Sequence, residues 1–239
     1  MKPTTLSQGN TAIVYDADVL PAGDRSPAEL SEWFNPERWR AAGAVRGQAP
    51  GRGSSLFLET DFGPAVLRRY LRGGMVARVN RDRYLFRGVA ASRPFREFHL
   101  LRRMAADGLR VPQPLAALCA REGPFYRAAL LTRRIAPARP LPEHFTDARF
   151  DWRRLGAELR AFFDAGMAHA DLNARNILVH DDTEAAWVID LDASRYDPGH
   201  PVDGAGQLAR LRRSLEKLWP AGAPDLGQRW AALLEGHAA

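Results

Sequence analysis

The segment HADLNARNILVHDDTEAAWVIDLD, residues 169–192, decides how the chain is interpreted. His169, Asp171 and Asn176 follow the pattern H-x-D-L-x-x-x-N, and Asp190 comes after two short apolar runs that predict a β-hairpin. Asn176 follows Asp171 by five positions, which makes a tight loop, and the hairpin would return Asp190 beside that loop. One segment can therefore supply a catalytic carboxylate and two ligands for Mg²⁺.

The pattern matches what phosphoryl transfer requires. The reaction needs a cation to neutralise the phosphates and a carboxylate to orient the attacking hydroxyl. Asp171 suits the carboxylate role, as base or orienting group, while Asn176 and Asp190 suit Mg²⁺. A neutral histidine has no obvious proton to move here, so we expect His169 to hold the loop through hydrogen bonds. The competing interpretation is a loop whose Asp and Asn side chains only cap backbone groups.

The composition is that of a soluble globular protein. With 239 residues, 46% of them hydrophobic, the chain can form one large domain or two small lobes. Cys119 is the only cysteine, so an intramolecular disulfide is excluded. The N-terminus lacks the apolar core of a signal peptide, and no apolar run approaches the roughly 18 residues of a spanning helix. We therefore expect a cytoplasmic protein whose membrane association, if any, is peripheral.

The basic residues are almost all arginines, since Lys2 and Lys217 are the only lysines among 34 basic residues. Mutational bias in a GC-rich genome explains the choice of arginine, but the distribution is uneven. Residues 68–103 hold eleven arginines against Asp82 and Glu97, a local charge of +9 in a chain of net charge +6. Such an arginine block predicts an anionic partner: nucleotide phosphates, a phosphorylated lipid surface or nucleic acid. A solvated face with arginine stems over apolar surface is the alternative.

Local patterns divide the chain into a helical extension (1–43), a sheet-rich part (44–135) and a mainly helical part (136–239). A capping box at 26–29 and an Asn-Pro pair at 35–36 mark two short helices in the extension. The proline-rich run IAPARPLP separates the other two parts and is predicted to be a hinge.

These elements predict an α+β fold. The sheet-rich part alternates β-like runs with glycine-containing turns, carries one amphipathic helix and ends in a second hairpin. The last part supplies helices on both sides of residues 169–192. The predicted ranges are strands within 44–72, a helix at 93–106, strands at 114–120 and 125–133, and helices at 147–165, 203–219 and 226–236.

A second cation is expected on a strand that faces the nucleotide phosphates, yet the sheet-rich part contains no lysine. The residues AVLR at 65–68 stand where V-A-I-K would be expected, so Arg68 is the first choice and Arg69 the second. Strand alternation lets only one of them face the cleft. Glu97 is the only acid on the helix at 93–106 and is the expected partner. The alternatives are a solvated Arg68 and a Glu97 paired with an arginine of its own helix.

A loop that covers phosphates is expected between the first two predicted strands of the sheet-rich part. Gly47, Gly51, Gly53 and Ser54 lie there, where backbone N–H groups can approach phosphate oxygens. The sequence G-R-G-S is also a common turn, so this signal is weaker than the pattern at 169–192.

Four departures from the protein-kinase pattern narrow the type of kinase. Ala170 replaces the arginine of H-R-D, and no A-P-E follows Asp190, so regulation by a phosphorylated activation loop is not expected. Asn173 stands where protein Ser/Thr kinases usually have lysine, and Asp192 stands where D-F-G has glycine. Both indicate a small-molecule or glycan acceptor, with Asp192 able to add a metal contact or bind an acceptor hydroxyl.

Six segments together resemble the bacterial lipopolysaccharide kinase family, and within it the kinases of 3-deoxy-D-manno-octulosonic acid (Kdo). They cover residues from about 44 to 192 in the order of the family, and the arginine-aromatic block at 82–101 is what points to this subfamily. The segments are VLRRYLRGG (66–74), DRYLFRG (82–88), RPFREFHLL (93–101), LRVPQPLAA (109–117), YRAALLTRRI (126–135) and HADLNARNILV (169–179).

The resemblance implies a bilobal, protein-kinase-like fold, with an N-lobe of antiparallel sheet plus one helix and a mainly helical C-lobe. It implies ATP with a divalent metal, and transfer of phosphate to the 4-hydroxyl of Kdo in a Kdo-lipid A precursor during lipopolysaccharide core biosynthesis. It also implies work at the cytoplasmic face of the inner membrane, whose anionic surface would attract the arginine block.

Two other functions share the motif and stay open at this point. One is a small-molecule kinase of the aminoglycoside or choline type, and the other is a catalytically inactive kinase-like scaffold, against which the intact base and metal positions speak. Nucleic-acid binding is not expected, because the sequence has no recognised motif of that class. The oligomeric state stays open too.

Overall fold

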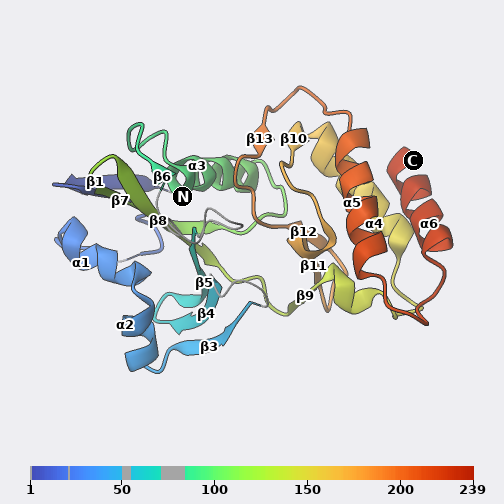
Figure 1. Cartoon of the computed structure of the whole chain (residues 1–239), viewed down its shortest axis with the longest axis horizontal. Helices are drawn as coiled ribbons and strands as arrows, with labels where there is room; N and C mark the ends of the chain where they lie inside the picture. The colour runs from blue at the N-terminus through green and yellow to red at the C-terminus, as the bar shows by residue number, and fades with distance from the viewer. Residues whose placement is uncertain (1, 21, 50–54, 71–83) are drawn as a thin grey trace. The chain divides into compact units, whose positions relative to one another are not determined.

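The computed structural model describes residues 2–20, 22–49, 55–70 and 84–239. The chain forms two compact units. Unit 1 comprises residues 1–103 and 112–134, and unit 2 comprises residues 104–111 and 135–239. Most elements of both units are labelled in Figure 1. The described part of the chain has three antiparallel sheets and six α-helices.

Unit 1 is built on one antiparallel sheet of eight strands, in the order β1-β2-β7-β8-β5-β4-β3, with β6 paired to β8. The hairpin predicted at 114–133 is confirmed, since β7 and β8 pair along their full length. The strands are β1 (Pro3–Gln8), β2 (Thr11–Asp16), β3 (Val45–Gln48), β4 (Ser55–Thr60), β5 (Gly63–Arg69), β6 (Tyr84–Leu85), β7 (Pro114–Glu122) and β8 (Phe125–Arg133).

The first 43 residues differ from the predicted helical extension. The helices α1 (Pro27–Ser31) and α2 (Pro36–Ala41), linked by η1 (Glu32–Phe34), form where their caps predict them. Before them, however, β1 and β2 form a hairpin that pairs with β7 and belongs to the sheet. The missed signal is the two-residue turn Gly9-Asn10, in which Gly9 has a φ of 58°, between two β-prone runs.

Different helices cover the two faces of the sheet. Ala65 and Leu67 of β5 are buried in a core that also contains Trp33 and Trp39 of the α1–α2 segment. Arg68 directly follows Leu67 and points to the opposite face, where it meets Glu97 of α3 (Arg93–Ala106). Neighbouring residues of a strand point to opposite faces, so Arg68 reaches α3 and Arg69 does not.

Unit 2 packs three helices around short strands. Asp151 caps α4, so the helix begins a few residues later than its predicted range, and the last two helices lie within two residues of theirs. Two small sheets complete the unit, with strand orders β12-β11-β9 and β10-β13. The elements are β9 (Ala138–Pro140), η3 (Leu141–His144), α4 (Trp152–Asp164), β10 (Met167–Ala168), η4 (Ala174–Asn176), β11 (Ile177–His180), β12 (Ala186–Val188), β13 (Arg195–Tyr196), α5 (Ala205–Leu218) and α6 (Leu226–Ala238).

Two glycines allow α4 and α6 to pack with their backbones in contact. A Cβ added to Gly156 of α4 would lie 1.9 Å from Leu233 O of α6, and one added to Gly236 of α6 would lie 1.8 Å from Arg153 O of α4. Because the obstructing atoms belong to the backbone, no side chain can turn away to make room. The close packing of the two helices therefore depends on glycine at both positions.

We expect Gly156→Ala to destabilise the protein by about 1–3 kcal/mol or more, because the added methyl group forces the two helices apart. Gly206→Ala is the matched control, since nothing lies within 4 Å of a Cβ at Gly206 of α5. The control should leave stability unchanged or raise it by up to about 1 kcal/mol. Thermal unfolding followed by circular dichroism measures both, and a Gly156→Ala protein as stable as the wild type would contradict the packing described.

Candidate active site

The predicted catalytic loop lies in unit 2, between α4 and β11. The chain leaves α4 at Gly166, whose φ is 93° and whose added Cβ would lie 2.0 Å from Asp197 O, so this position requires glycine. The pairing of β10 with β13 fixes the start of the loop, and the pairing of β11 with β12 and β9 fixes its end. The loop is therefore held by strand pairing on both sides.

His169 ties the loop to the strand that precedes Asp190. Its side chain is buried, Nε2 lies 3.0 Å from Ile189 O, and Nδ1 accepts the N–H of Asp171 at 3.0 Å. A carbonyl oxygen can only accept, so Nε2 carries the proton and the ring is neutral. Burial lowers the pKa of His169, which favours the same neutral form. This geometry is what the predicted structural role of His169 requires.

The β11–β12 hairpin brings Asn176 and Asp190 to one end of the small sheet. Ile177 pairs with Val188, and one step beyond that pair the N–H of Ile189 donates to Asn176 O at 2.9 Å. Asp190 follows directly, with a φ of 60° that is uncommon outside glycine. Such a conformation costs of order 1 kcal/mol and persists where the surroundings fix it, as the bond from His169 does here.

The amide of Asn176 beside Asp171 turns its oxygen atom toward a role as metal ligand. Nδ2 of Asn176 donates to Asp171 O at 2.9 Å, so Oδ1 is the part of that amide able to bind a metal ion. Nδ2 of Asn173 donates to Asp171 O and to Asp171 Oδ2, both at 3.1 Å. An amide oxygen and the Asp190 carboxylate are hard oxygen donors, which fit Mg²⁺. The described residues contain no group of three or more His, Cys, Asp or Glu placed for a metal, and Mg²⁺ in kinases needs few protein ligands because phosphates complete its shell.

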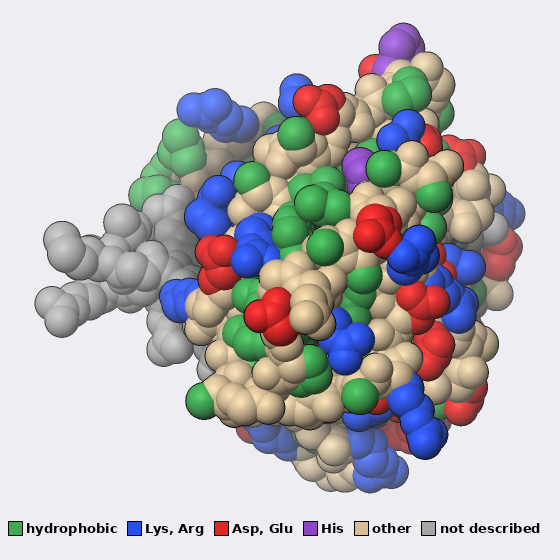
Figure 2. Space-filling model, turned by 90° about the vertical axis from the view of Figure 1, so that its right-hand side faces the viewer, with side chains coloured by type: hydrophobic (Ala, Val, Ile, Leu, Met, Phe, Trp, Pro, Cys, Tyr) green, Lys and Arg blue, Asp and Glu red, His purple; other side chains and the backbone are tan. Residues whose placement is uncertain are grey.

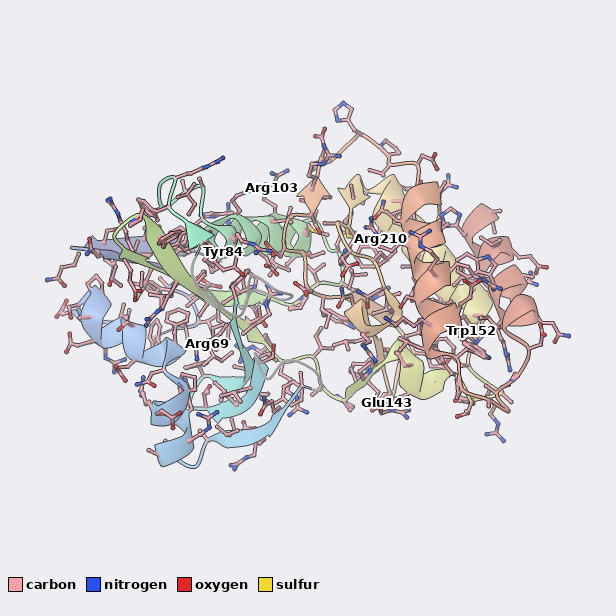
Figure 3. The ribbon with its side chains drawn as sticks, viewed as in Figure 1. Arg69, Tyr84, Arg103, Glu143, Trp152 and Arg210 are labelled. Atoms are coloured by element: carbon pink, nitrogen blue, oxygen red, sulfur yellow. The ribbon has the colours of Figure 1, made fainter. Side chains whose placement is uncertain are left out.

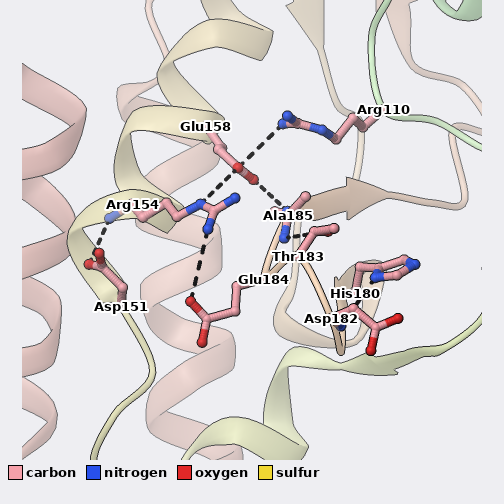
Figure 4. A network of polar contacts seen from close by, with 10 residues as sticks. Arg110, Asp151, Arg154, Glu158, His180, Asp182, Thr183, Glu184 and Ala185 are labelled. Atoms are coloured by element: carbon pink, nitrogen blue, oxygen red, sulfur yellow. Dashed lines mark hydrogen bonds and ion pairs between the residues drawn. The ribbon is translucent and has the colours of Figure 1, made fainter.

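Glu158 of α4 supports the hairpin from behind (Figure 4). Its carboxylate, whose side chain is only 12% exposed, accepts a hydrogen bond from the N–H of Ala186 at the start of β12. Arg110 lies 3.3 Å and Arg154 3.4 Å from Glu158 Oε1, so the partly buried charge is neutralised on two sides. The strand that leads to Asp190 is thereby fixed to α4.

Further side chains of unit 2 reach the backbone of the loop, and the sequence analysis did not foresee them. Ser194 comes from the turn before β13, whereas Gln207, Arg210 and Ser214 come from α5. The three residues of α5 recur at helical spacing, so they share one face of the helix. The sequence alone does not indicate what that face contacts. Arg210 is labelled on α5 in Figure 3.

Arg68 and Glu97 are brought together in unit 1, as the sequence predicts. Nη2 of Arg68 donates to Glu97 Oε2 and, at 3.0 Å, to Tyr70 OH, while Tyr70 OH donates to the same Glu97 oxygen at 2.5 Å. Glu97 is only 3% exposed, so its charge depends on these two donors. Burial, with the charge of Glu97 beside it, raises the pKa of Tyr70 well above its usual value, and the phenol stays protonated. Sequence reasoning missed Tyr70, although strand alternation places it two positions after Arg68.

Arg69, the second choice for the strand cation, lines a pocket on the other face of the sheet. That pocket includes Leu67 and Arg127 and is bordered by α2, not by α3. Gly51, Gly53 and Ser54 of the predicted phosphate loop lie outside the described residues. Gly47 is described and lies in β3.

Comparison with known proteins shows the family that the chain resembles. The model of the family described as "Lipopolysaccharide kinase (Kdo/WaaP) family" matches residues 36–237. A 3-deoxy-D-manno-octulosonic acid kinase of Xanthomonas axonopodis pv. citri is 42% identical over 220 residues, which cover 91% of this chain and 85% of the relative. One of Vibrio vulnificus is 39% identical over 217 residues, covering 87% and 86% of the two chains.

A solved structure gives the same picture of the fold. The structure described as WaaP in complex with acyl carrier protein aligns with a TM-score of 0.51 and 16% sequence identity, covering 87% of this chain and 86% of that one. At this identity the likeness concerns the fold alone. The family match and the two relatives, which extend over most of the chain, show more: the chain belongs to the lipopolysaccharide kinase (Kdo/WaaP) family.

Proposed function

We propose that this chain is an ATP-dependent kinase that phosphorylates the 4-hydroxyl of Kdo in a Kdo-lipid A precursor, a step of lipopolysaccharide core biosynthesis. The observation that carries the proposal is the gathering of Asp171, Asn176 and Asp190 by one loop and hairpin of unit 2. Family membership supports the reaction, and the names of the Xanthomonas and Vibrio relatives support the acceptor.

A bilobal, protein-kinase-like fold is part of the proposal. Unit 1, with its antiparallel sheet and α3, has the secondary structure expected of an N-lobe. Unit 2 is mainly helical, as expected of a C-lobe. The likeness to the solved WaaP structure supports this assignment.

The chemistry assigned to unit 2 centres on Asp171. Its carboxylate orients the acceptor hydroxyl and takes its proton as the oxygen bonds to the γ-phosphorus and the bond to the leaving ADP breaks. Oδ1 of Asn176 and the carboxylate of Asp190 would hold Mg²⁺, which neutralises phosphate charge when bound. Asp192, two residues after Asp190, is assigned a contact with the metal or with an acceptor hydroxyl.

In unit 1, Arg68 is assigned to the nucleotide phosphates. Its guanidinium carries five N–H donors, and Nη2 is held by Glu97 and Tyr70. An arginine guanidinium can bind phosphate oxygens in a bidentate way, which suits it to this role. Gly51, Gly53 and Ser54 stay predicted to cover the same phosphates.

Asp171→Ala should lower the rate of transfer to a Kdo-lipid A precursor by about 10²- to 10⁴-fold, because the general base is removed. Asp182→Ala is the control, since Asp182 is an exposed acid of the same hairpin. It should keep its activity within about twofold. Mass spectrometry of the lipid after incubation with ATP and Mg²⁺ reports the gain of one phosphate.

Three outcomes of that assay contradict the proposal. Transfer to soluble alcohols but not to the lipid by the wild type would indicate a small-molecule kinase. Binding of ATP with no transfer to any acceptor would indicate an inactive scaffold. A fully active Asp171→Ala protein would remove Asp171 from the reaction.

Tyr70→Phe should raise the KM for ATP by about 3- to 30-fold with a smaller effect on kcat, because Glu97 loses one of its two donors and holds Arg68 less firmly. Tyr196→Phe is the matched control, since Tyr196 OH donates to Asp107 at 2.7 Å within unit 2. Steady-state kinetics with varied ATP separates the two variants. Equal KM values for Tyr70→Phe and the wild type would show that Tyr70 does not support the nucleotide site.

Peripheral attachment to the cytoplasmic face of the inner membrane is also part of the proposal. No helix in the described part of the chain is long and apolar enough to cross a membrane. Leu85 in the arginine block is 53% exposed, and Arg87 beside it is exposed too. Between them, the Arg121 guanidinium lies 4.9 Å from the centre of the Phe86 ring. An exposed apolar residue among arginines suits an anionic lipid surface. Arg78, Arg81 and Arg83 of the block lie outside the described residues.

Leu85→Glu should reduce binding to phosphatidylglycerol vesicles severalfold, because it removes an apolar contact and adds a negative charge. Leu234→Glu is the control, since Leu234 of α6 is the other exposed large hydrophobic residue of the described part, at 41%. The face of the molecule drawn in Figure 2 shows basic, acidic and hydrophobic side chains intermixed. Vesicle flotation measures binding, and equal losses in both variants would contradict the assignment to the arginine block.

A further inference from the structure

Three side chains from one face of α5 contact the backbone of the catalytic loop. Oε1 of Gln207 accepts the N–H of His169 at 2.6 Å, Nη1 of Arg210 donates to Ala170 O, and Oγ of Ser214 accepts the N–H of Ala174 at 3.1 Å. The three positions are separated by three and four residues, so they lie in a row along one side of the helix. One helix thus contacts the loop on both sides of Asp171.

The loop obtains its hydrogen bonds from side chains rather than from a strand ladder. The N–H groups of three successive residues donate to Gln207 Oε1, to Ser194 Oγ at 3.0 Å and to His169 Nδ1 at 3.0 Å. Buried or partly buried backbone groups need such partners, and each partner restricts the loop to one conformation. The conformation around Asp171 is therefore set by side chains: Gln207 and Ser194 from elsewhere in unit 2, and His169 of the loop itself.

The peptide bond between Ala170 and Asp171 is held at both of its polar ends. Its carbonyl oxygen accepts from Arg210, and its N–H donates to His169 Nδ1. Two bonds in opposite directions fix the rotation of the peptide plane, which determines the direction in which the Asp171 side chain leaves the backbone. The bond from Arg210 involves a charged donor, and such bonds are roughly twice as strong as neutral ones.

We propose that Arg210 is a positioning residue for phosphoryl transfer, because it fixes the peptide plane from which the Asp171 carboxylate extends. The proposal rests on the proposed function of Asp171 as the orienting group and base. Position 170 is alanine where H-R-D has arginine, so the guanidinium at this part of the loop is supplied by α5. Arg210 acts through Asp171 and need not touch substrate.

The helix that carries Arg210 is itself well fixed. Leu208, Leu211 and Leu215 are at most 6% exposed, and Trp219 at the end of α5 stacks on Phe145 with ring centroids 4.5 Å apart. Because the helix is tightly packed, a side chain on it can hold the group that it binds in a fixed position. The charge of Arg210 also adds to the effect of burial in lowering the pKa of His169, which favours the neutral ring that accepts from Asp171.

Arg210→Ala should lower kcat for transfer to a Kdo-lipid A precursor by about 10- to 100-fold, because a small misplacement of a reacting group has effects of this size. The KM for ATP should stay within about twofold, since the assigned nucleotide contacts are elsewhere. Arg213→Ala is the matched control, because Arg213 is an exposed arginine of the same helix. It should retain wild-type kcat.

Rescue of the Arg210→Ala activity distinguishes a positioning role of Arg210 from a general loss of structure. Millimolar guanidinium, far below denaturing concentrations, should restore part of the kcat of Arg210→Ala and have no effect on Arg213→Ala. Arg210→Lys keeps a charged donor near Ala170 O, and it should be at least severalfold more active than Arg210→Ala. Rescue by either route supports the proposal, even if Arg210→Ala is less stable than the wild type.

Two results would overturn the inference. One is an Arg210→Ala kcat equal to that of Arg213→Ala, and the other is a reduced kcat that neither guanidinium nor lysine restores. The wild type assayed in parallel keeps the two proposals distinct. Absence of any transfer by the wild type contradicts the proposed function, whereas wild-type transfer that Arg210→Ala retains contradicts only the positioning role.

Discussion

The peptide bond that joins Ala170 to Asp171 is the constraint on which the site in unit 2 depends. Its carbonyl is held by Arg210 and its N–H by His169, and His169 in turn donates to the carbonyl of Ile189, next to Asp190. The neutral histidine therefore couples the loop of the proposed base to the strand of a proposed metal ligand. Protonation of that ring would remove the acceptor of the Asp171 N–H, and burial opposes protonation.

Unit 1 fixes its own cation by the same physical means. A carboxylate as buried as Glu97 is costly unless donors surround it, and Arg68 with Tyr70 supplies them. The guanidinium of Arg68 is thereby restrained, because moving it away would leave the buried carboxylate of Glu97 without its charged partner. In both units a buried polar group that must be satisfied sets the position of a residue assigned to the reaction.

The sequence predicts the parts of this arrangement that depend on local pattern. The caps of α1 and α2, the β7–β8 hairpin and the β11–β12 hairpin follow from residues next to one another in the chain. The pairing of Arg68 with Glu97 could also be predicted, because only one acid lies on the helix and strand alternation separates Arg68 from Arg69. The hairpin of β1 and β2 around Gly9-Asn10, which extends the sheet, was not predicted, because β1 (PTTLSQ) is mostly polar.

The contacts of α5 could not be predicted in this way. Gln207, Arg210 and Ser214 lie about forty residues beyond the atoms they bind. Their spacing is that of any amphipathic helix, and only the folded unit shows which surface of the protein they meet. The same holds for Glu158, whose hydrogen bond to the β11–β12 hairpin crosses from α4. Ala170 stands where the motif has arginine. The guanidinium that contacts this peptide bond comes instead from Arg210 of α5, outside the loop.

The central claim is that the loop of Asp171 directs phosphate to one hydroxyl of Kdo. Phosphorus and proton NMR of the purified lipid product, after incubation of the wild-type protein with ATP, Mg²⁺ and a Kdo-lipid A precursor, tests it most directly. The account predicts one new phosphate monoester, with its phosphorus coupled to the proton at carbon 4 of Kdo. A phosphate on the lipid A sugars, or an unchanged lipid in the presence of bound ATP, would contradict it.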